Sequence, residues 1–288
     1  MSGTDPVQRL TERAEAAEAL AAERGEQLAL VLDVLRSRDR AAAEQAEWDF
    51  ATELQLAGLP QDFPAFPDRP EIDLHAGMVT AKEVGGDLYD FFLLDRNRLA
   101  FIVADAAGKG LPAAIFITLA RTLLKAAAER KADPGACLDM VNAMLCLDNP
   151  TLMFVTAFYG VLDLSTGQLV YANAGHNPPY ALGTGRGVEL VPSTGDMALG
   201  IWEESRYATR QLTLAPGDAL ICFSDGVTEA VNPGGELFGE PRLEARLADQ
   251  LTAHPTEVLG TVIAEVDQFM SLAPMADDVT LLVLRYNG

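Results

Sequence analysis

Residues 87–106, DLYDFFLLDRNRLAFIVADA, contain two apolar runs joined by the polar turn at residues 95–97. Apolar runs of this length around a short turn are typical of a β-hairpin. The arrangement returns at residues 153–175, where MFVTAFYGVLDL and QLVYANAG flank residues 165–167. Consecutive hairpins predict antiparallel sheets rather than alternating βαβ units.

A third pair of apolar runs, RYATRQLTL and DALICFSDG at residues 206–226, flanks Ala215-Pro216-Gly217 and predicts another hairpin. Apolar periodicity and Pro positions predict helices over residues 111–131, 134–147, 241–252 and 255–272. VTLLVLRY at residues 279–286 is expected to form the last strand. This order predicts an α+β fold: a four-layer α/β/β/α sandwich of two antiparallel sheets flanked by helix pairs.

The first 58 residues have a different composition, with Ala, Glu, Leu and Arg dominating. A weak heptad pattern over residues 10–42 predicts a long N-terminal helix that dimerises as a coiled coil. The alternative is an amphipathic helix that packs on its own domain. We therefore expect a helical regulatory segment at 1–58, a linker at 59–70 that contains four prolines, and a catalytic domain at 71–288.

The formal net charge of −21 argues against nucleic acid as a partner, because phosphate binding needs clustered Lys and Arg. The three widely spaced cysteines exclude a disulfide scaffold. The polar N-terminus does not resemble a secretory signal, and no run of 18 apolar residues predicts a membrane span. We therefore expect a cytoplasmic protein.

Four short segments place acidic residues next to apolar strands, three of them beside glycine: VGGDLYD (84–90), ADAAGKG (104–110), SDGVTE (224–229) and DDVT (277–280). Carboxylates that converge repel one another unless a cation lies between them. Hard oxygen ligands suit Mg²⁺ or Mn²⁺, and the histidines have no zinc-ligand spacing. Together the four segments predict a metal site. A tight turn is the alternative for each segment taken alone.

Other chemistries have little support in the sequence. No G-x-S-x-G elbow and no phosphate-binding P-loop motif are present. The run Gly108-Lys109-Gly110 precedes a predicted helix, whose N-terminus could hold an anion. A tight turn that needs small residues is the alternative.

Seven ordered blocks resemble the PPM metal-dependent serine/threonine protein phosphatases, in their SpoIIE/RsbU-like bacterial branch. These blocks are EVGGDLYDFF, ADAAGKGLPAAIF, ANAGHNPPY, ALGIWEE, PGDALICFSDGVTEA, ELFGEPRL and DDVTLLVLR. The resemblance covers residues 71–286 and implies an α/β/β/α sandwich that binds two or three Mn²⁺ or Mg²⁺ ions.

The resemblance also implies roles for individual residues. Those implied as catalytic are Asp87, Asp105, Asp225 and Asp277. Those implied as metal ligands are Asp87, Asp105, Ala106 through its carbonyl, Asp225, Asp277 and Asp278. Residues expected to contact substrate or to maintain the structure are Gly86, Gly108, Lys109, His176 and Gly226. No arginine can be assigned to phosphate by motif.

The implied function is hydrolysis of phosphoserine or phosphothreonine on a regulatory protein, in this branch an anti-sigma-factor antagonist, by a metal-activated hydroxide. Three alternatives stay open. The chain could be a weak or inactive phosphatase fold that serves as a binding or sensor module, a coiled-coil scaffold, or a phosphohydrolase for small molecules.

Overall fold

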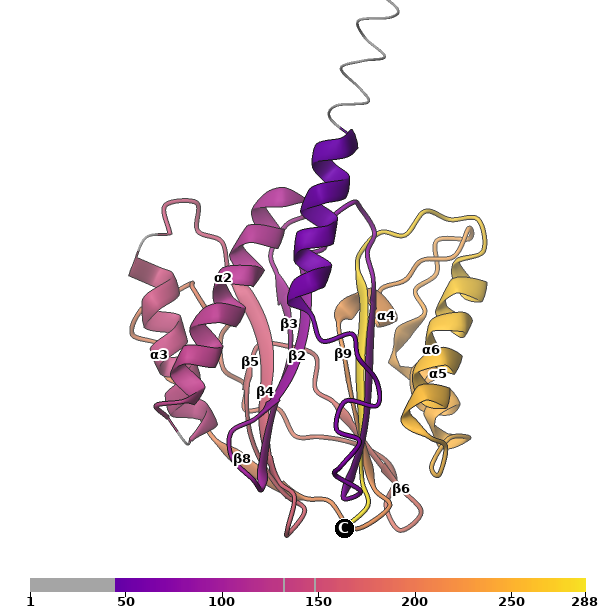
Figure 1. Ribbon diagram of the computed structural model, residues 1–288. Helices are drawn as coiled ribbons and strands as arrows, with labels where there is room; N and C mark the ends of the chain where they lie inside the picture. Colours follow the sequence, from indigo (N-terminus) through magenta and orange to yellow (C-terminus); the bar gives the residue numbers. More distant parts are fainter. Residues whose placement is uncertain (1–44, 132, 148) are drawn as a thin grey trace, which may run out of the picture. The chain divides into compact units, whose positions relative to one another are not determined.

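The computed structural model describes residues 45–131, 133–147 and 149–288 (Figure 1). The chain divides into two units, Met1–Ala51 and Thr52–Gly288. In the first unit residues 45–51 are helical, and Gln45 Nε2 donates a hydrogen bond to Asp49 Oδ1 one turn later. The heptad pattern at residues 10–42, and the coiled coil predicted from it, lie outside the described residues.

In its described part, the second unit contains ten strands. They are β1 (Ile72–Val79), β2 (Asp87–Leu93), β3 (Arg98–Ala106), β4 (Val155–Asp163), β5 (Gln168–Ala174), β6 (Tyr180–Gly183), β7 (Gly187–Leu190), β8 (Arg210–Thr213), β9 (Ala219–Phe223) and β10 (Val279–Tyr286). Sheet A has the strand order β1-β10-β9-β6-β7, and sheet B has the order β2-β3-β4-β5-β8. Every ladder is antiparallel, as the sequence predicts.

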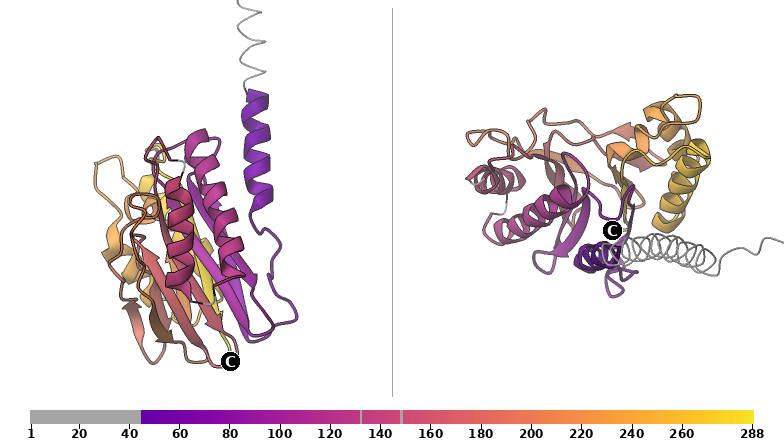
Figure 2. Two further views of the ribbon diagram at one scale, coloured as in Figure 1. Left: turned by 90° about the vertical axis from the view of Figure 1, so that its left-hand side faces the viewer. Right: turned by 90° about the horizontal axis from the view of Figure 1, so that it is seen from above.

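Four long helices form the two outer layers of the described part of this unit, which also contains helical residues 52–58 and one short helix. The labelled helices are α2 (Leu111–Ala128), α3 (Pro134–Leu147), the single turn α4 (Asp225–Thr228), α5 (Gly239–Ala248) and α6 (Pro255–Met270). Helices α2 and α3 cover sheet B, and α5 and α6 cover sheet A (Figures 1 and 2). The predicted α/β/β/α order is therefore confirmed.

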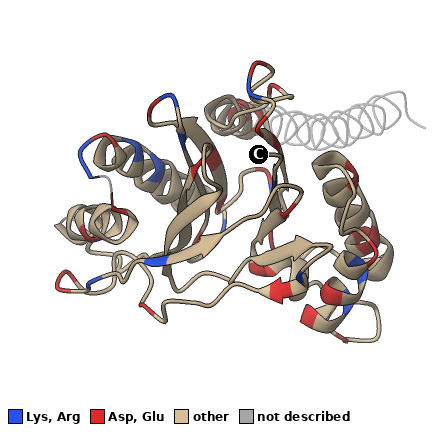
Figure 3. Cartoon of the chain, turned by 90° about the horizontal axis from the view of Figure 1, so that it is seen from below, with Lys and Arg blue, Asp and Glu red and all other residues tan. Residues whose placement is uncertain are grey.

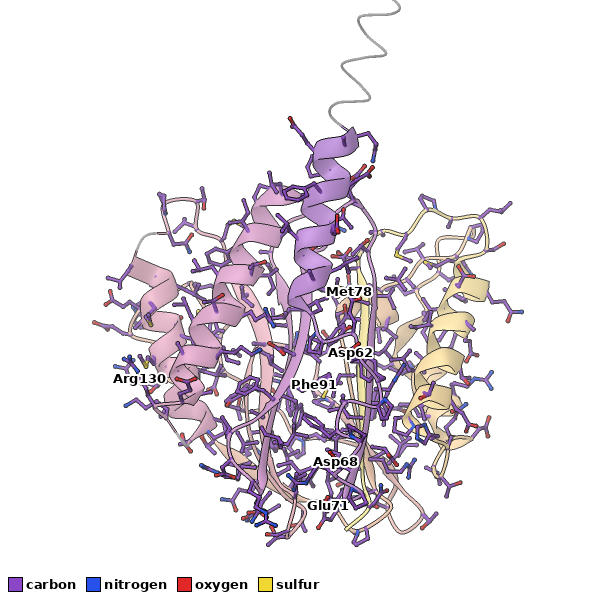
Figure 4. All side chains as sticks on the ribbon, viewed as in Figure 1. Asp62, Asp68, Glu71, Met78, Phe91 and Arg130 are labelled. Carbon is purple, nitrogen blue, oxygen red and sulfur yellow. The ribbon has the colours of Figure 1, made fainter. Side chains whose placement is uncertain are left out.

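Apolar side chains fill the space between the layers (Figure 4). Phe91 on β2 contacts the rings of Phe63 and Phe66, which lie in the proline-containing segment. Helix α2 is long and apolar enough to span a membrane by length and composition, a test that a core helix also passes. Its buried residues, among them Ile117 and Leu124, belong to the core that covers sheet B, so we interpret α2 as a core helix.

Helix ends follow local chemistry. Helix α6 begins with a capping box: the His254 side chain accepts from the Thr256 nitrogen, and the Glu257 carboxylate accepts from the His254 nitrogen. Pro255 occupies the first turn, where no backbone N–H is needed. Acidic residues are spread over the helices and loops, with Lys and Arg scattered among them (Figure 3).

The predicted hairpin at residues 206–226 is wrong. Strand β8 pairs with β5 in sheet B, whereas β9 pairs with β10 and β6 in sheet A. The intervening turn bonds to β10 instead, because Gly217 N donates to the Tyr286 carbonyl and Tyr286 N donates to the Asp218 carbonyl. The chain thus crosses from one sheet to the other at a turn that looks like a hairpin in sequence.

Three elements, β6, β7 and α4, were not predicted. Strands β6 and β7 form a hairpin of four-residue strands whose glycine-rich sequence lacks an alternating pattern. Helix α4 begins at Asp225, directly after β9. The long helices agree with prediction within a few residues at their ends.

Candidate metal centre

The predicted acidic residues come from both sheets. Asp87 begins β2 and lies directly opposite Asp105 of β3 in the antiparallel register. Asp225 follows β9, and Asp277 closely precedes β10. The four carboxylates are close enough to influence one another: burial, followed by the charges of Asp225, Asp277 and Asp278, raises the pKa of Asp105 to about 7. Segments far apart in sequence therefore bring their charges to one place.

Asp87 is the most deeply buried of these carboxylates. Its side chain is almost fully enclosed, and its Oδ2 has no hydrogen-bond partner among the described residues. Burial raises the pKa of Asp87 well above its ordinary value, and the charge of Asp105 adds to this effect. The hydroxyls of Ser224 and Thr280 act in the opposite direction. A buried carboxylate oxygen without a partner is what a cation-binding position would present.

Asp225 and Asp277 stand at the more open side of the group. Burial raises the pKa of Asp225, and the charges of Glu229 and Asp277 contribute. The ammonium of Lys109 lowers that pKa and lies 2.7 Å from Asp277 Oδ2. The Asp277 side chain is 37% exposed, so it can be reached from solvent.

Asp278 holds the backbone of the loop before β2. Its Oδ1 accepts a hydrogen bond from Ala81 N at 2.7 Å, and its Oδ2 accepts one from Gly86 N at 2.6 Å. Burial raises the pKa of Asp278, and these backbone bonds oppose the rise. The observed contacts give Asp278 a role in positioning Asp87, which follows Gly86 directly.

One of the predicted glycines is required by space, and a second is tightly packed. A Cβ on Gly226 would lie 1.9 Å from the Asp278 carbonyl oxygen. A Cβ on Gly86 would lie 3.2 Å from the carbonyl oxygen of Ala106. The Ala106 carbonyl therefore packs closely against the residue that precedes β2. Gly108 differs, because a Cβ there would meet no neighbouring atom. Its φ of 93° lies in the left-handed region, which glycine adopts more readily than other residues.

His176 lies inside the protein, beneath the acidic group. Its Nδ1 is 2.8 Å from Thr156 Oγ1, and Thr156 is the cross-strand partner of Asp105. Asn173 fixes the His176 backbone through two hydrogen bonds, one in each direction. Burial lowers the pKa of His176 to about 4, so the ring is neutral at pH 7. These contacts favour the structural role for His176.

The donor set fits a hard divalent cation. Asp87, Asp105, Asp225 and Asp277 supply only carboxylate oxygens, and the unpartnered Asp87 Oδ2 lies among them. Within residues 45–131, 133–147 and 149–288, no three acidic, His or Cys side chains already stand at ligand spacing. The Lys109 ammonium pairs with Asp277, so a cation bound there would compete with it for the Asp277 carboxylate.

Sequence reasoning missed one residue that supports this centre from the preceding helix. Residues 52–58 of the second unit are helical, and Gln55 is bonded twice to Gly85. Gln55 Nε2 donates to the Gly85 carbonyl at 2.6 Å, and Gly85 N donates to Gln55 Oε1 at 2.9 Å. Gln55 carries no motif, so only the fold reveals its contact with the loop that leads to Asp87.

Comparison with known proteins gives matches over the same region. The family profile of stage II sporulation protein E (SpoIIE) matches residues 95–287. Protein IcfG of Synechocystis is 30% identical over 250 residues, covering 77% of this chain and 39% of IcfG. Phosphoserine phosphatase RsbU of Bacillus subtilis is 28% identical over 219 residues, covering 76% of this chain and 64% of RsbU. The chain therefore spans less than two thirds of either relative.

Among solved structures, the SiaA-PP2C domain of Pseudomonas aeruginosa superposes with a TM-score of 0.76 at 25% sequence identity. The superposition covers 85% of this chain and 98% of that domain.

Proposed function

We propose that this chain, which belongs to the SpoIIE family of PP2C-type serine phosphatases, hydrolyses phosphoserine or phosphothreonine on a regulatory protein. The observation that carries the proposal is the proximity of the four carboxylates described above: Asp105 lies opposite Asp87, whose Oδ2 has no partner among the described residues, and the charges of Asp225 and Asp277 act on Asp105. Neighbouring carboxylates repel one another, and a cation bound between them would offset that repulsion.

Asp87, Asp105, Asp225 and Asp277 would hold Mn²⁺ or Mg²⁺, with the Ala106 carbonyl beside them. Divalent cations in such a site make hydroxide available near neutral pH and offset the charge of a phosphoryl group. The chain's own residues set the geometry. Asp278 and Gln55 fix the loop before Asp87, and Gly226 lets the Asp225 turn pack against the backbone of Asp278.

We infer that the substrate is a small phosphorylated anti-sigma-factor antagonist, the class that the family resemblance implies. The relative RsbU is named a phosphoserine phosphatase, which supports hydrolysis of a phosphorylated serine. We further propose the division into a regulatory segment at 1–58, a linker at 59–70 and a catalytic domain at 71–288. A homodimer formed through the first segment and a cytoplasmic location belong to the same proposal.

The test is hydrolysis of p-nitrophenyl phosphate and of a phosphoserine protein by the purified chain with Mn²⁺. The wild-type protein is expected to be active. The kcat of Asp225→Asn is expected to be lower by about 100-fold or more, as is typical when one electrostatic contribution to catalysis is removed. Asp249→Asn, a change of the same kind in an exposed acid after α5, is the control. Equal rates for wild type and Asp225→Asn would contradict the proposal.

A second function is favoured by the pairing of Lys109 with Asp277, which closes part of the acidic group without any cation. On this reading the chain is an inactive phosphatase fold that binds a partner. Calorimetric titration with Mn²⁺ separates the two functions. An enzyme is expected to bind Mn²⁺ at the acidic group and to lose that binding in Asp87→Asn, whereas an inactive fold is expected to show no such binding.

A further inference from the structure

Large apolar side chains are exposed on three segments near the acidic group: the start of α2, the turn after α3 and the loop at residues 196–203. The start of α2 and the end of α3 lie at the same end of this helix pair (Figure 1). We call these side chains the apolar patch, and they are Leu111, Ile115, Leu152, Phe154, Ile201 and Trp202. Exposed apolar side chains that gather in one place indicate an interaction surface.

The apolar patch adjoins the acidic group. The Phe154 carbonyl accepts a hydrogen bond from Ala107 N at 2.8 Å, and Ala107 follows Asp105 by two residues. Leu111 begins α2 four residues after Ala107. A protein whose phosphorylated residue reaches the acidic group therefore comes to lie beside the patch.

The three segments also adjoin one another. Val155 and Leu199 exchange two backbone hydrogen bonds of 2.9 and 2.8 Å, which join the turn after α3 to the loop. A Cβ on Gly200 would lie 3.0 Å from the Met153 carbonyl oxygen and 3.6 Å from the Phe116 ring of α2. The loop therefore packs against both the turn and the helix, and the apolar patch is one surface.

Two asparagines hold the backbone under the patch. Asn149 Nδ2 donates to the Met153 carbonyl at 2.6 Å and to the Gly200 carbonyl at 3.1 Å. The buried Asn142 donates to the Trp202 carbonyl at 2.9 Å and accepts from Gly200 N at 2.9 Å. Because these backbone groups are satisfied inside the protein, the loop is fixed while 59% of Trp202 stays exposed.

Leu152 adds evidence that the exposure serves a purpose. Its φ of 53° is left-handed, a conformation that is unfavourable for a leucine. The residue is 77% exposed, so burial of its side chain in the described chain does not compensate for this conformation. Contact with another molecule would account for a large apolar side chain held in this way.

Charge narrows the choice of occupant. The chain has a net charge of −21, so a phosphorylated protein is not drawn to the acidic group by long-range attraction. Glu203 and Glu204, both exposed, follow Trp202 at the rim of the patch. Binding of such a protein therefore has to come from short-range contacts, and the patch supplies apolar ones next to the acidic group.

We propose that the apolar patch binds the residues that flank the phosphoserine of the protein substrate, and thereby selects phosphoserine with apolar neighbours. This proposal rests on the phosphatase function proposed above. Ile115 lies about 6 Å beyond Leu111 along the axis of α2. An extended chain spans about 3.3 Å per residue, so residues two or three positions from the phosphoserine cover that length.

The experiment compares wild type, Ile115→Gln and Trp202→Gln, each with Mn²⁺, on p-nitrophenyl phosphate and two phosphoserine peptides. The peptides differ only in having leucine or serine at the positions that flank the phosphoserine. Wild type is expected to prefer the leucine peptide by about tenfold in kcat/KM. Each variant should lower kcat/KM on that peptide about fivefold through KM, because a contact made equally before and during the reaction is lost.

The small substrate and a distant variant serve as controls. Rates on p-nitrophenyl phosphate should stay near wild type, because this molecule has no flanking residues. Leu190→Gln makes a similar change at a residue that is 49% exposed on the edge strand β7 of the other sheet. It is expected to match wild type on all three substrates.

Four outcomes would overturn the proposal. An active wild type that hydrolyses both peptides equally well would refute the role of the patch and leave the phosphatase function intact. An equal change on all three substrates would show that the patch only supports the centre. Unchanged selectivity with a lower mass by light scattering would assign the patch to a second copy of the chain. A wild type that hydrolyses none of the substrates would refute the phosphatase function, and the present proposal with it.

Discussion

Gly226 is the residue at which the centre tolerates least change. An added Cβ would overlap the Asp278 carbonyl, a backbone atom that cannot swing away. Gly226→Ala is therefore expected to lower the free energy of unfolding by about 3 kcal/mol, at the upper end for overpacking. Urea denaturation measures the loss. Gly185→Ala, in open space at the β6–β7 turn, is the control and should stay near wild type.

The buried acids predict an unusual pH dependence for the metal-free protein. Burial and neighbouring carboxylates raise the pKa of Asp105 to about 7 and that of Asp87 well above its ordinary value. The folded state therefore holds protons that the unfolded state has lost, so these groups make stability fall as pH rises from about 4 to about 7.

Thermal unfolding in a chelating buffer tests this dependence. The wild-type Tm should fall across pH 5 to 7.5, and Asp105→Asn should flatten the fall. Mn²⁺ should raise the Tm more at pH 7.5 than at pH 5, because at the lower pH it must displace protons. A wild-type Tm that rises over this range without metal would contradict the assignment.

Between elements, β2 and α2 are joined by a buried ion group. Asp90 Oδ2 lies 2.6 Å from Arg121 Nε and 2.9 Å from Lys125 Nζ, and only 1% of the Asp90 side chain is exposed. Asp90→Asn should cost about 2 kcal/mol, because the Asp90 carboxylate is buried, whereas the Arg121 and Lys125 side chains that lose it are partly exposed and can be solvated. Chemical denaturation would show it. Asp95→Asn, which breaks the exposed pair with Arg98, is the control and should change stability far less, because solvent screens that pair.

The helical segment 52–58 reaches the centre through Gln55. Because Gln55 holds both backbone polar groups of Gly85, Gln55→Ala should loosen the loop that positions Asp87. We expect Mn²⁺ affinity to fall several-fold, with little change in Tm, as measured by calorimetry and thermal unfolding. Gln61→Ala is the matched control, because Gln61 bonds only to the nearby Leu56 carbonyl. Equal Mn²⁺ affinity in all three proteins would exclude the coupling.

The sequence predicts most elements because long apolar runs and capped helices are local signals. Strands β2 to β5 and helix α3 follow from such runs. The partner of a strand is not a local property, which explains why β8 and β9 were assigned to one hairpin. Motifs likewise identify Asp87 and Asp225. The motifs do not show which carboxylates are free to bind a ligand. Asp278 is not, because both its oxygens accept backbone hydrogen bonds.

For the whole molecule, the two-unit division gives a test of the proposed dimer. Removal of residues 1–51 keeps Gln55 and the second unit. The full chain should have the mass of a dimer by light scattering, and the shortened chain that of a monomer with changed activity. Unchanged mass and unchanged hydrolysis after the deletion would exclude a regulatory dimer formed through this segment.

Strand β10 lies in the interior of sheet A, between β1 and β9. During synthesis about two hundred residues are added after β1 before its neighbour β10 is made. Asp277 is synthesised just before β10. A nascent chain that stops before β10 lacks both the middle of a sheet and one side of the acidic group. A chain released before β10 therefore cannot contain the complete acidic group, and we expect proteases to recognise such incomplete products as unfolded.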